Sequence, residues 1–585
     1  MTGDQELSIE QKLALGANVR LVEACPGAGK TRSIVERFKQ RVDGSVGAAA
    51  LLSFTNTAID EVMSRCLDRP DLLRAPHFVG TFDTFLHRYV VTPHVAQTLG
   101  KFPTYLQSWK DLPGNLGSLP PTRETWKRIS LTNFCHKSSG EISFLIDSLD
   151  RKEKQAFESL RDEVSRRRFI ELGANTIRDH NNRGVYDSDS ARWAALEILR
   201  GDKGPGIIAR LTNRFSNIIV DEFQDCAALE HEFLGILEQA GIKVTVVADP
   251  DQSIFGFRQA EPQLYVDYRN TIPEQDIVSF SVNHRSSPVI CELVQHLRHL
   301  PISTMTSAQS ELSGVCPSIY LLGGSADRVR TRFISLSDDW NIPFNQRAAL
   351  AYRRKDARIL AAGGKNPPES NACTARLLMN LSILRSGGSS FTRLGALLDV
   401  ERLLMGIFQW TSEQTRLNSA QKLELLGKDR LWVRLIVGEI LTSATDWEDE
   451  GSTGESVRAI LARVLTNLPV PIEGRLSNKF AKPSSEVWSH WLNSSEPRDQ
   501  FSNVEWSTIH ASKGREFDAV LLKIPEVDTM SSWIAGEGSE GRRVFYVGAS
   551  RAKKLLALAT SLERLAEVKE QLESFSLPVV AESLA

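Results

Sequence analysis

The sequence predicts an α/β protein with two parallel-sheet domains, each interrupted by a mostly helical insertion. Short, continuous apolar runs alternate with helical stretches in the first ninety residues, and such runs return after residue 286. A long stretch rich in Arg, Leu, Glu and Trp interrupts the first group of apolar runs, and a Leu-rich stretch interrupts the second. Because a strand buried on both faces is apolar throughout, these runs indicate parallel sheets covered by helices on both sides.

The bulk composition sets wide limits on function. A chain of 585 residues is too long for one hydrophobic core, and about three to five structural units are expected. The chain is 41% hydrophobic and 24% charged, with 70 basic and 72 acidic residues and a net charge of -2. This balance neither indicates nor excludes a nucleic-acid partner, since a basic groove needs only a local excess of charge.

The cysteines and the N-terminus point to a cytoplasmic protein without a membrane anchor. The seven cysteines are dispersed and none forms a CxxC pair, which argues against a disulfide framework and against a zinc or iron–sulfur site. The first twelve residues are polar and acidic, unlike a signal peptide. No apolar run is long enough to span a bilayer.

The first domain is expected to comprise residues 1–86 and 214–285. Its strands are predicted from four buried runs, at residues 19–24, 47–54, 217–223 and 243–249. Residues 87–213 differ in character and form the first helical insertion.

The second domain is expected to comprise residues 286–385 and 500–575, with strands at 348–353 and 517–524. The insertion at 386–499 is expected to be helical, because the Leu and Met spacing in this part of the chain is typical of helical core. Residues 576–585 are expected to form a tail.

A phosphate-binding loop follows the first predicted strand and precedes a helix. Its glycines allow backbone N–H groups to surround phosphate oxygens, and the helix N-terminus adds a favourable dipole. Lys30 can reach the β and γ phosphates, and the Thr31 hydroxyl can ligate Mg²⁺. The sequence therefore predicts an ATP site at Ala24, Gly27, Ala28, Gly29, Lys30, Thr31 and Arg32.

Two adjacent carboxylates follow the predicted strand at 217–223. Asp221 can hold the Mg²⁺ shell, and Glu222 can orient and deprotonate the attacking water. An Asp-Glu pair after a strand is weak evidence by itself, because most such pairs are solvated. Together with the phosphate loop, it indicates ATP hydrolysis.

Eight segments in the correct order give the chain a resemblance to the UvrD, Rep and PcrA helicases of superfamily 1. DEFQD, followed by VVADPDQSIFGFRQA, resembles motifs II and III of that family. The resemblance implies two RecA-like domains, 1A and 2A, with insertions 1B and 2B. The other segments that resemble family motifs are residues 7–11, 51–62, 79–90, 283–287, 507–522 and 542–556.

The resemblance implies roles for six further residues at the ATP site. Gln11 reads the adenine edge, His284 stacks on the base and Glu516 contacts the ribose. Gln252 senses the γ phosphate or its water. Arg285 and Arg551 neutralise charge on the transferred phosphoryl group, as cis arginines do when a second domain contributes to hydrolysis.

The resemblance also implies a partner, single-stranded or tailed duplex DNA, crossed in the 3′→5′ direction. Aromatic faces stack on bases without sequence preference, while hydroxyls, Asn and Arg hold phosphates. The positions that match strand-facing residues of the family are Phe54, Thr55, Asn56, Thr81, Phe82, Phe257, Arg258 and His510.

The chain departs from the family pattern at several positions. His284 replaces the usual adenine-stacking aromatic, Phe257 replaces a Trp, and Asp83 replaces the His that follows Gly-Thr-Phe. The Gly-Gly-aromatic segment that follows Tyr-Arg in the family is not recognisable after Arg353. The second insertion is shorter than in the archetypal helicases, which bears on unwinding but not on ATP hydrolysis.

Two functions from different classes follow. The first is an ATP-dependent DNA helicase and translocase. The second is a DNA-responsive ATPase subunit that regulates a partner nuclease in an antiviral or repair complex, similar to the GajB-like helicase subunits of Gabija systems. A protein that only binds ATP is disfavoured, because Glu222, Gln252, Arg285 and Arg551 are all present.

Overall fold

The computed structural model describes most of the chain in fourteen segments. The described residues are 7–44, 47–106, 108–112, 116–121, 128–254, 262–298, 304–314, 318–362, 373–385, 390–411, 414, 419–495, 504–524 and 540–584.

The first domain is built on a six-stranded sheet in which every neighbouring pair is parallel, in the order β12-β1-β11-β10-β2-β3. Four of its strands arise from the buried runs seen in the sequence. The strands are β1 (Leu21–Ala24), β2 (Ala48–Ser53), β3 (Phe78–Thr81), β10 (Phe215–Val220), β11 (Lys243–Ala248) and β12 (Ile277–Phe280).

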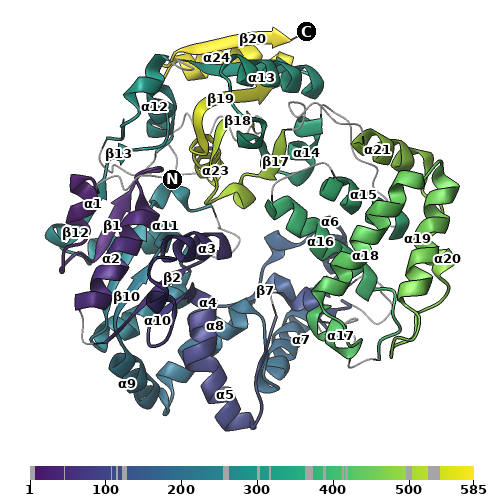
Figure 1. Ribbon diagram of the computed structural model, residues 1–585. Coiled ribbons are helices and arrows are strands. Elements are labelled where there is room, and N and C mark those ends of the chain that lie inside the picture. Colours follow the sequence, from purple (N-terminus) through teal and green to yellow (C-terminus); the bar gives the residue numbers. More distant parts are fainter. Residues whose placement is uncertain are drawn as a thin grey trace.

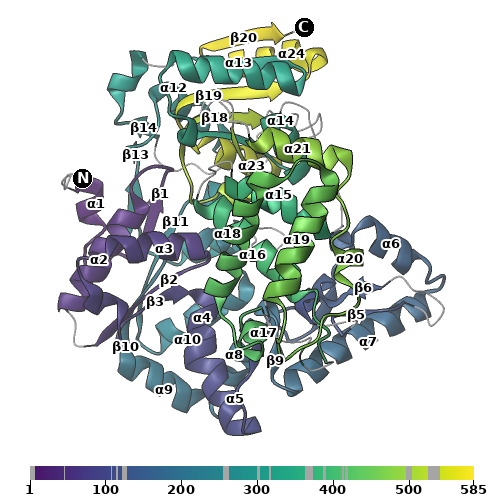
Figure 2. The same cartoon turned by 45° about the vertical axis from the view of Figure 1, so that its right-hand side comes forward.

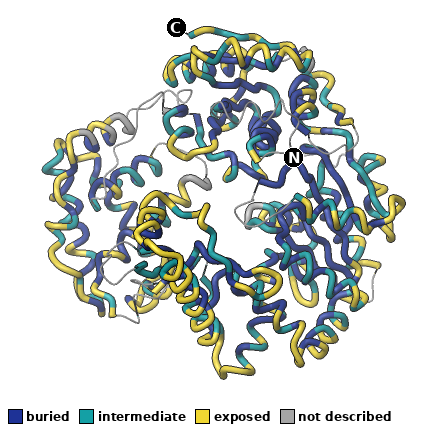
Figure 3. Tube along the Cα trace, turned by 180° about the vertical axis from the view of Figure 1, so that it is seen from behind, coloured by how far each residue is buried: buried dark blue, intermediate teal, exposed yellow. Residues whose placement is uncertain are grey.

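Helices cover both faces of this sheet, which explains why its strands are apolar throughout (Figure 3). On β10, Ile219 faces one core while Ile218 and Val220 face the other. The helices α2 (Lys30–Gly44) and α3 (Asn56–Arg65) pack on the first face. The other face is covered by α4 (Phe82–Leu86), α8 (Ser188–Arg200) and α10 (Ala228–Gln239).

The second domain repeats this plan with the strand order β17-β16-β18-β19-β15-β20, again parallel throughout. The expectation of two parallel-sheet domains is therefore confirmed. The helices that cover it are α12 (Pro288–Leu297), α13 (Ala326–Asp339), α14 (Arg354–Ala362), α23 (Glu540–Ala549) and α24 (Leu565–Glu573). The strands are β15 (Ile319–Gly324), β16 (Arg347–Ala351), β17 (Glu505–Thr508), β18 (Phe517–Lys523), β19 (Ala552–Thr560) and β20 (Val579–Leu584).

The strand β20 corrects the expectation that residues 576–585 form a tail. It pairs along its full length with β15 and closes one edge of the second sheet. Arg332 of α13 forms a two-pronged ion pair with Glu582, at 2.6 and 2.7 Å, which ties the strand to the neighbouring helix.

The first insertion holds a small aromatic core of its own, with Trp109, Phe134, Phe157 and Phe169 buried in it. Three two-stranded ladders accompany its helices, a feature that helical composition did not reveal. The helices α6 (Arg151–Glu158) and α7 (Glu163–Asn182) pack in this core. The helices α5 (Thr92–Leu99) and α9 (Gly204–Arg214) pack, as α8 does, on the core of the first domain.

The second insertion is a helical unit with a separate core (Figure 1, right). It begins with α15 (Cys373–Arg385), whose Leu377, Leu378 and Leu381 are buried in that core. The expected boundary at residue 386 is therefore wrong, because α15 packs with the insertion. The remaining helices are α16 (Ser390–Met405), α17 (Ser419–Leu425), α18 (Arg430–Ser443), α19 (Glu450–Val464), α20 (Leu476–Lys479) and α21 (Ser485–Ser495).

The two sheets are joined by one continuous apolar core. This core contains Val22 and Leu51 of the first sheet and Leu350 and Val520 of the second, linked through α12 and α23. Figures 1 and 2 show the first domain beside the second, with the carboxyl-terminal strand at the far edge. Among the described helices, none combines the length and apolar character needed to cross a bilayer.

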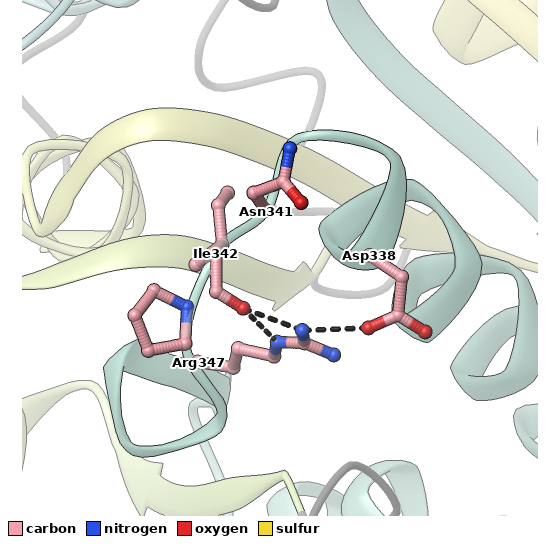
Figure 4. A pocket seen from close by; sticks show the side chains of 5 residues that line it. Asp338, Asn341, Ile342 and Arg347 are labelled. Atoms are coloured by element: carbon pink, nitrogen blue, oxygen red, sulfur yellow. Dashed lines mark hydrogen bonds and ion pairs between the residues drawn. The ribbon is translucent and has the colours of Figure 1, made fainter.

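A pocket of about 430 Å³ lies at the amino end of β16 (Figure 4). The Arg347 guanidinium donates to the Ile342 carbonyl at 2.9 Å and pairs with Asp338 at 2.7 Å. Ligands of open parallel sheets bind outside the carboxyl ends of the strands. This pocket therefore lies at the wrong end of the sheet for the predicted ATP site.

Candidate nucleotide-binding site

The phosphate loop joins β1 to α2 and depends on two glycines. Gly27 and Gly29 have φ angles of 69° and 81°, in the left-handed region that favours glycine. A Cβ on Gly27 would lie 2.7 Å from the Cβ of Arg285, and one on Gly29 would lie 2.4 Å from Nε2 of Gln11. Segments of motif IV and of the N-terminal helix therefore pack directly against this loop.

Lys30 begins α2 with its ammonium inside the protein. Its Nζ is buried and makes no hydrogen bond with any residue that the structure describes. It lies 4.0 Å from carboxylate oxygens of Glu222 and Asp249. A buried ammonium without a hydrogen-bond partner among the described residues, beside a glycine-containing loop at a helix N-terminus, suits the polyphosphate of a nucleotide. Thr31 and Arg32 follow in the first turn of α2.

The acid pair lies directly after β10. Burial, together with the charge of Glu222, raises the pKa of Asp221 to about 7. Burial would also raise the pKa of Glu222, but the charges of Lys513 and Lys30 outweigh it and hold that pKa below its usual range. A divalent cation would favour the ionised form of Asp221, and a carboxylate with a neighbouring hydroxyl such as that of Thr31 is a suitable donor set for Mg²⁺.

The backbone of Glu222 is strained. Its φ of 54° lies in the left-handed region, which is unfavourable for a residue with a side chain. The Glu222 carboxylate accepts a hydrogen bond from the amide of Gln224 at 2.6 Å. Gln224 in turn accepts from the backbone N–H of Asp249 at 3.0 Å. The side chain of Glu222 is thus held in one orientation.

Lys513 crosses from the second domain into this site. Its buried ammonium donates to Asp225 at 2.5 Å, lies 3.2 Å from Glu222 and donates to the carbonyl of Gln252 at 3.0 Å. Lys513 was not among the predicted site residues. Its only signal in the sequence is its place in the segment resembling motif V, where a buried lysine cannot be distinguished from a solvated one.

Arg551 of the second domain contacts Gln252, in the segment of the first domain that resembles motif III. Its Nη2 lies 3.5 Å from Oε1 of Gln252, whose Nε2 donates to Asp249 at 2.7 Å. Tyr546 of α23, a second residue that sequence reasoning missed, donates to the same Asp249 at 3.1 Å. The structure thus brings Gln252 and Arg551 together around the carboxylate that faces Lys30.

Arg285 and Glu516 lie at the edge of the loop and contact each other. The Arg285 Nε is 2.5 Å from Glu516, which also pairs with Lys553 at 2.9 Å. Glu516, the expected ribose ligand, therefore binds two cations. His284, the residue before Arg285, is exposed, and its backbone N–H donates to the carbonyl of Gly27 at 3.0 Å, which holds this segment of the backbone against the phosphate loop.

Gln11 is fixed by a short helix. The helix α1 (Ile9–Leu13) starts with a capping box in which Ser8 and Gln11 bond to each other. The Gln11 amide Nε2 also donates to the carbonyl of Ala28 at 2.9 Å. The side chain expected to read adenine is thus held against the phosphate loop.

One residue that was predicted to contact DNA, Phe82, is buried in the core instead. Phe54 stacks on Phe82 with ring centroids 5.6 Å apart, but the Phe82 side chain is only 1% exposed and packs on Phe233. Phe82 therefore supports Phe54 from the core and does not offer its own face to a base. Thr55 and Thr81 cap the N-termini of α3 and α4.

Of the remaining residues predicted to contact DNA, the structure describes two and leaves two undescribed. His510 is partly buried and meets Tyr352 edge to face, at 5.4 Å between ring centroids. Asn56 opens α3. Phe257 and Arg258 lie outside the described residues.

Asp83, the departure from the family pattern, is an internal ion-pair partner. Arg192 of α8 contacts both oxygens of Asp83, at 2.7 and 3.1 Å, and lies 3.0 Å from Glu230. The acid therefore binds the first insertion to the first domain.

The fold and the site define a P-loop nucleoside triphosphatase in which Lys513 of a second RecA-like domain contacts the acid Glu222 of the first. Family comparisons agree with this class. The description "UvrD/REP helicase N-terminal domain" matches residues 6–273, and "UvrD-like helicase C-terminal domain" matches residues 477–563.

Individual relatives extend the match along the chain. It is 24% identical over 578 residues to the ATP-dependent DNA helicase UvrD2 of Mycobacterium bovis, covering 93% of this chain and 76% of that protein. It is 21% identical over 618 residues to the probable DNA helicase II homolog of Mycoplasma genitalium, covering 95% and 84%. It is 25% identical over 284 residues to DNA helicase II of Escherichia coli, covering 46% and 36%. The chain belongs to the UvrD/Rep family of helicases and is an ATP-hydrolysing enzyme.

Proposed function

We propose that this protein couples ATP hydrolysis to 3′→5′ movement along single-stranded DNA and thereby separates tailed duplexes. One observation carries the proposal: Lys513 and Arg551 of the second domain contact the acid pair and motif III of the first. ATP hydrolysis in the first domain then depends on the position of the second domain. This dependence is required if ATP hydrolysis is to drive a movement of one domain relative to the other.

Each residue of the ATP site has its own role in hydrolysis. The phosphate loop binds the polyphosphate of ATP, and Lys30 contributes its buried charge. Glu222 orients the attacking water and accepts its proton. Thr31 and Asp221 would hold Mg²⁺, which when bound neutralises charge on the phosphates. Arg285 and Arg551 stabilise charge that develops on the transferred phosphoryl group.

The comparisons favour this function over that of an ATPase subunit regulating a nuclease. The relatives that match along most of the chain bear the names of DNA helicases. In this proposal DNA binds across both domains and contacts Phe54 of the first domain and His510 of the second.

Strand displacement on duplexes with a 3′ tail or a 5′ tail tests the proposal directly. Unwinding of the 3′-tailed substrate alone, with ATP and Mg²⁺, is the expected result. Glu222→Gln should retain ATP binding but abolish DNA-stimulated phosphate release, whereas Lys30→Ala should abolish both. Unwinding from the 5′ tail alone would refute the polarity, and normal turnover by Glu222→Gln would refute the catalytic assignment.

A further inference from the structure

Glu516 is shared between two cations that come from different segments. Its Oε2 lies 2.5 Å from Nε of Arg285, which follows β13 (Val282–Asn283). Its Oε1 lies 2.9 Å from Nζ of Lys553 on β19. The three side chains are partly shielded, with 42% of Glu516, 23% of Arg285 and 28% of Lys553 exposed. A carboxylate in such a position needs at least one cationic partner.

The surroundings of this cluster favour the ionised acid. Burial would raise the pKa of Glu516, but Arg285 and Lys553 outweigh burial and keep it below its usual range. Burial and the nearby charge of Arg285 lower the pKa of Arg551 to about 10, so the two arginines repel each other. Glu516 pairs with Arg285 and, together with Glu222 and Asp249, offsets the positive charge of Arg551.

Arg285 carries one positive charge, which Glu516 and the phosphoryl group would share. In this inference the guanidinium turns from the carboxylate towards the phosphate as charge develops there. Departure of Arg285 would leave Glu516 ionised and partly desolvated, which is costly unless a second cation remains. Lys553 is placed to remain, because it binds the other carboxylate oxygen.

We propose that Lys553 is a positioning residue for hydrolysis: it holds Glu516 while Arg285 moves to the phosphate, and so lowers the cost of that transfer. The inference rests on the proposed function and deepens it. Without Lys553, Arg285 would be the one ion-pair partner that Glu516 keeps among the described residues, and it would be released less readily. The loss should therefore appear in kcat more than in the KM for ATP.

The same pair of strands offers a matched control. Lys554, the next residue of β19, pairs with Asp518 of β18 at 2.8 Å. Lys554→Met removes an ion pair between β19 and β18, and Lys553→Met removes one between β19 and the residue just before β18. Lys554→Met leaves Glu516 and Arg285 untouched. If Lys553 contributed only to stability, Lys553→Met and Lys554→Met would have similar kcat values.

The experiment measures steady-state ATP hydrolysis by the full chain at saturating single-stranded DNA. Lys553→Met should lower kcat about tenfold with less than about a threefold change in KM, and Lys553→Arg should restore most of the loss. Lys554→Met should stay within about twofold of the wild type. In a Glu516→Gln background, Lys553→Met should have almost no further effect, because the anion that it compensates is gone.

Two results would overturn the inference while leaving the proposed function intact. One is equal kcat for Lys553→Met and Lys554→Met. The other is an undiminished effect of Lys553→Met in the Glu516→Gln background. Failure of the wild type to hydrolyse ATP in response to DNA would instead refute the proposed function. Thermal unfolding of each variant identifies any loss of kcat that comes from misfolding.

Discussion

Lys513 and Glu222 belong to different sheet domains, yet the ammonium of one lies 3.2 Å from the carboxylate of the other. The same ammonium donates to Asp225 at 2.5 Å, so one cation of the second domain contacts two acids of the first. Glu222, the proposed catalytic acid, therefore takes part directly in the contact between the domains. Any displacement of the second domain changes the electrostatic environment of Glu222.

Lys513→Met should impair both turnover and stability. Removal of one partner from a buried ion pair leaves the other uncompensated, and the cost is about 3 kcal/mol or more. DNA-stimulated phosphate release should fall on the order of 100-fold, since one cation that sets the charge of Glu222 is lost. Phosphate release and urea unfolding are the measurements. Adding Asp225→Asn should recover part of the stability but not the turnover, and wild-type turnover by Lys513→Met would contradict the role.

Phe54 and Phe82 should respond in opposite ways to truncation. Phe54→Ala should weaken binding of single-stranded DNA by about 1–3 kcal/mol, the usual contribution of one base stack. Phe82→Ala should instead lower the free energy of unfolding by about 3–5 kcal/mol, because it empties a buried site. Anisotropy of a labelled oligonucleotide and chemical denaturation separate the two effects. A Phe82→Ala protein of full stability that failed to bind DNA would show that its ring contacts a base.

Asp83→Ala should destabilise the junction between the first insertion and the first domain. Arg192 would lose both of its hydrogen bonds to Asp83 and keep only the contact with Glu230. A loss of about 2–3 kcal/mol in unfolding free energy is expected. Affinity for single-stranded DNA should not fall, because the substitution removes a negative charge near a polyanion. Weaker DNA binding at unchanged stability would show instead that Asp83 acts in recognition.

His231 should make the protein less stable in mild acid. Burial lowers its pKa to about 4 in the folded state, where its ring packs 4.6 Å from that of Phe223. An unfolded histidine has a pKa of about 6.5. The group therefore contributes stability that is present above pH 6.5 and is lost as the pH falls towards 4, by roughly 2 kcal/mol.

The matched variant for this pH effect is His231→Phe, which keeps an aromatic ring but cannot titrate. Melting temperatures of both proteins between pH 7 and 4 are the measurement. The wild type should lose more stability than the variant over that interval. Parallel curves would show that His231 does not contribute to the acid sensitivity.

Local signals in the sequence were sufficient for much of the fold and for the phosphate site. The runs that became β1, β2, β10 and β11 are apolar because helices cover both faces of the sheet. The phosphate loop was readable because its glycines and Lys30 lie within seven residues of the end of one strand.

Features that depend on distant partners could not be predicted in this way. The pairing of β20 with β15 joins segments more than 250 residues apart, and nothing in residues 579–584 specifies that partner. The helix α15 has the composition of either neighbouring unit, and only its packing assigns it to the insertion. Phe82 matched a DNA-contacting motif, but its burial is decided by Phe233 on another helix.

The apolar core shared by the two sheets limits how the enzyme can move. A wide separation of the domains would divide this core and bring water onto the apolar side chains buried where the two domains meet, at a cost that grows with each exposed side chain. Small sliding displacements would keep those side chains covered, so the shared core favours a shear of packed surfaces over a swing about a free hinge. If the protein moves along DNA as proposed, each such displacement is short, and long travel along the strand then requires many repeated cycles.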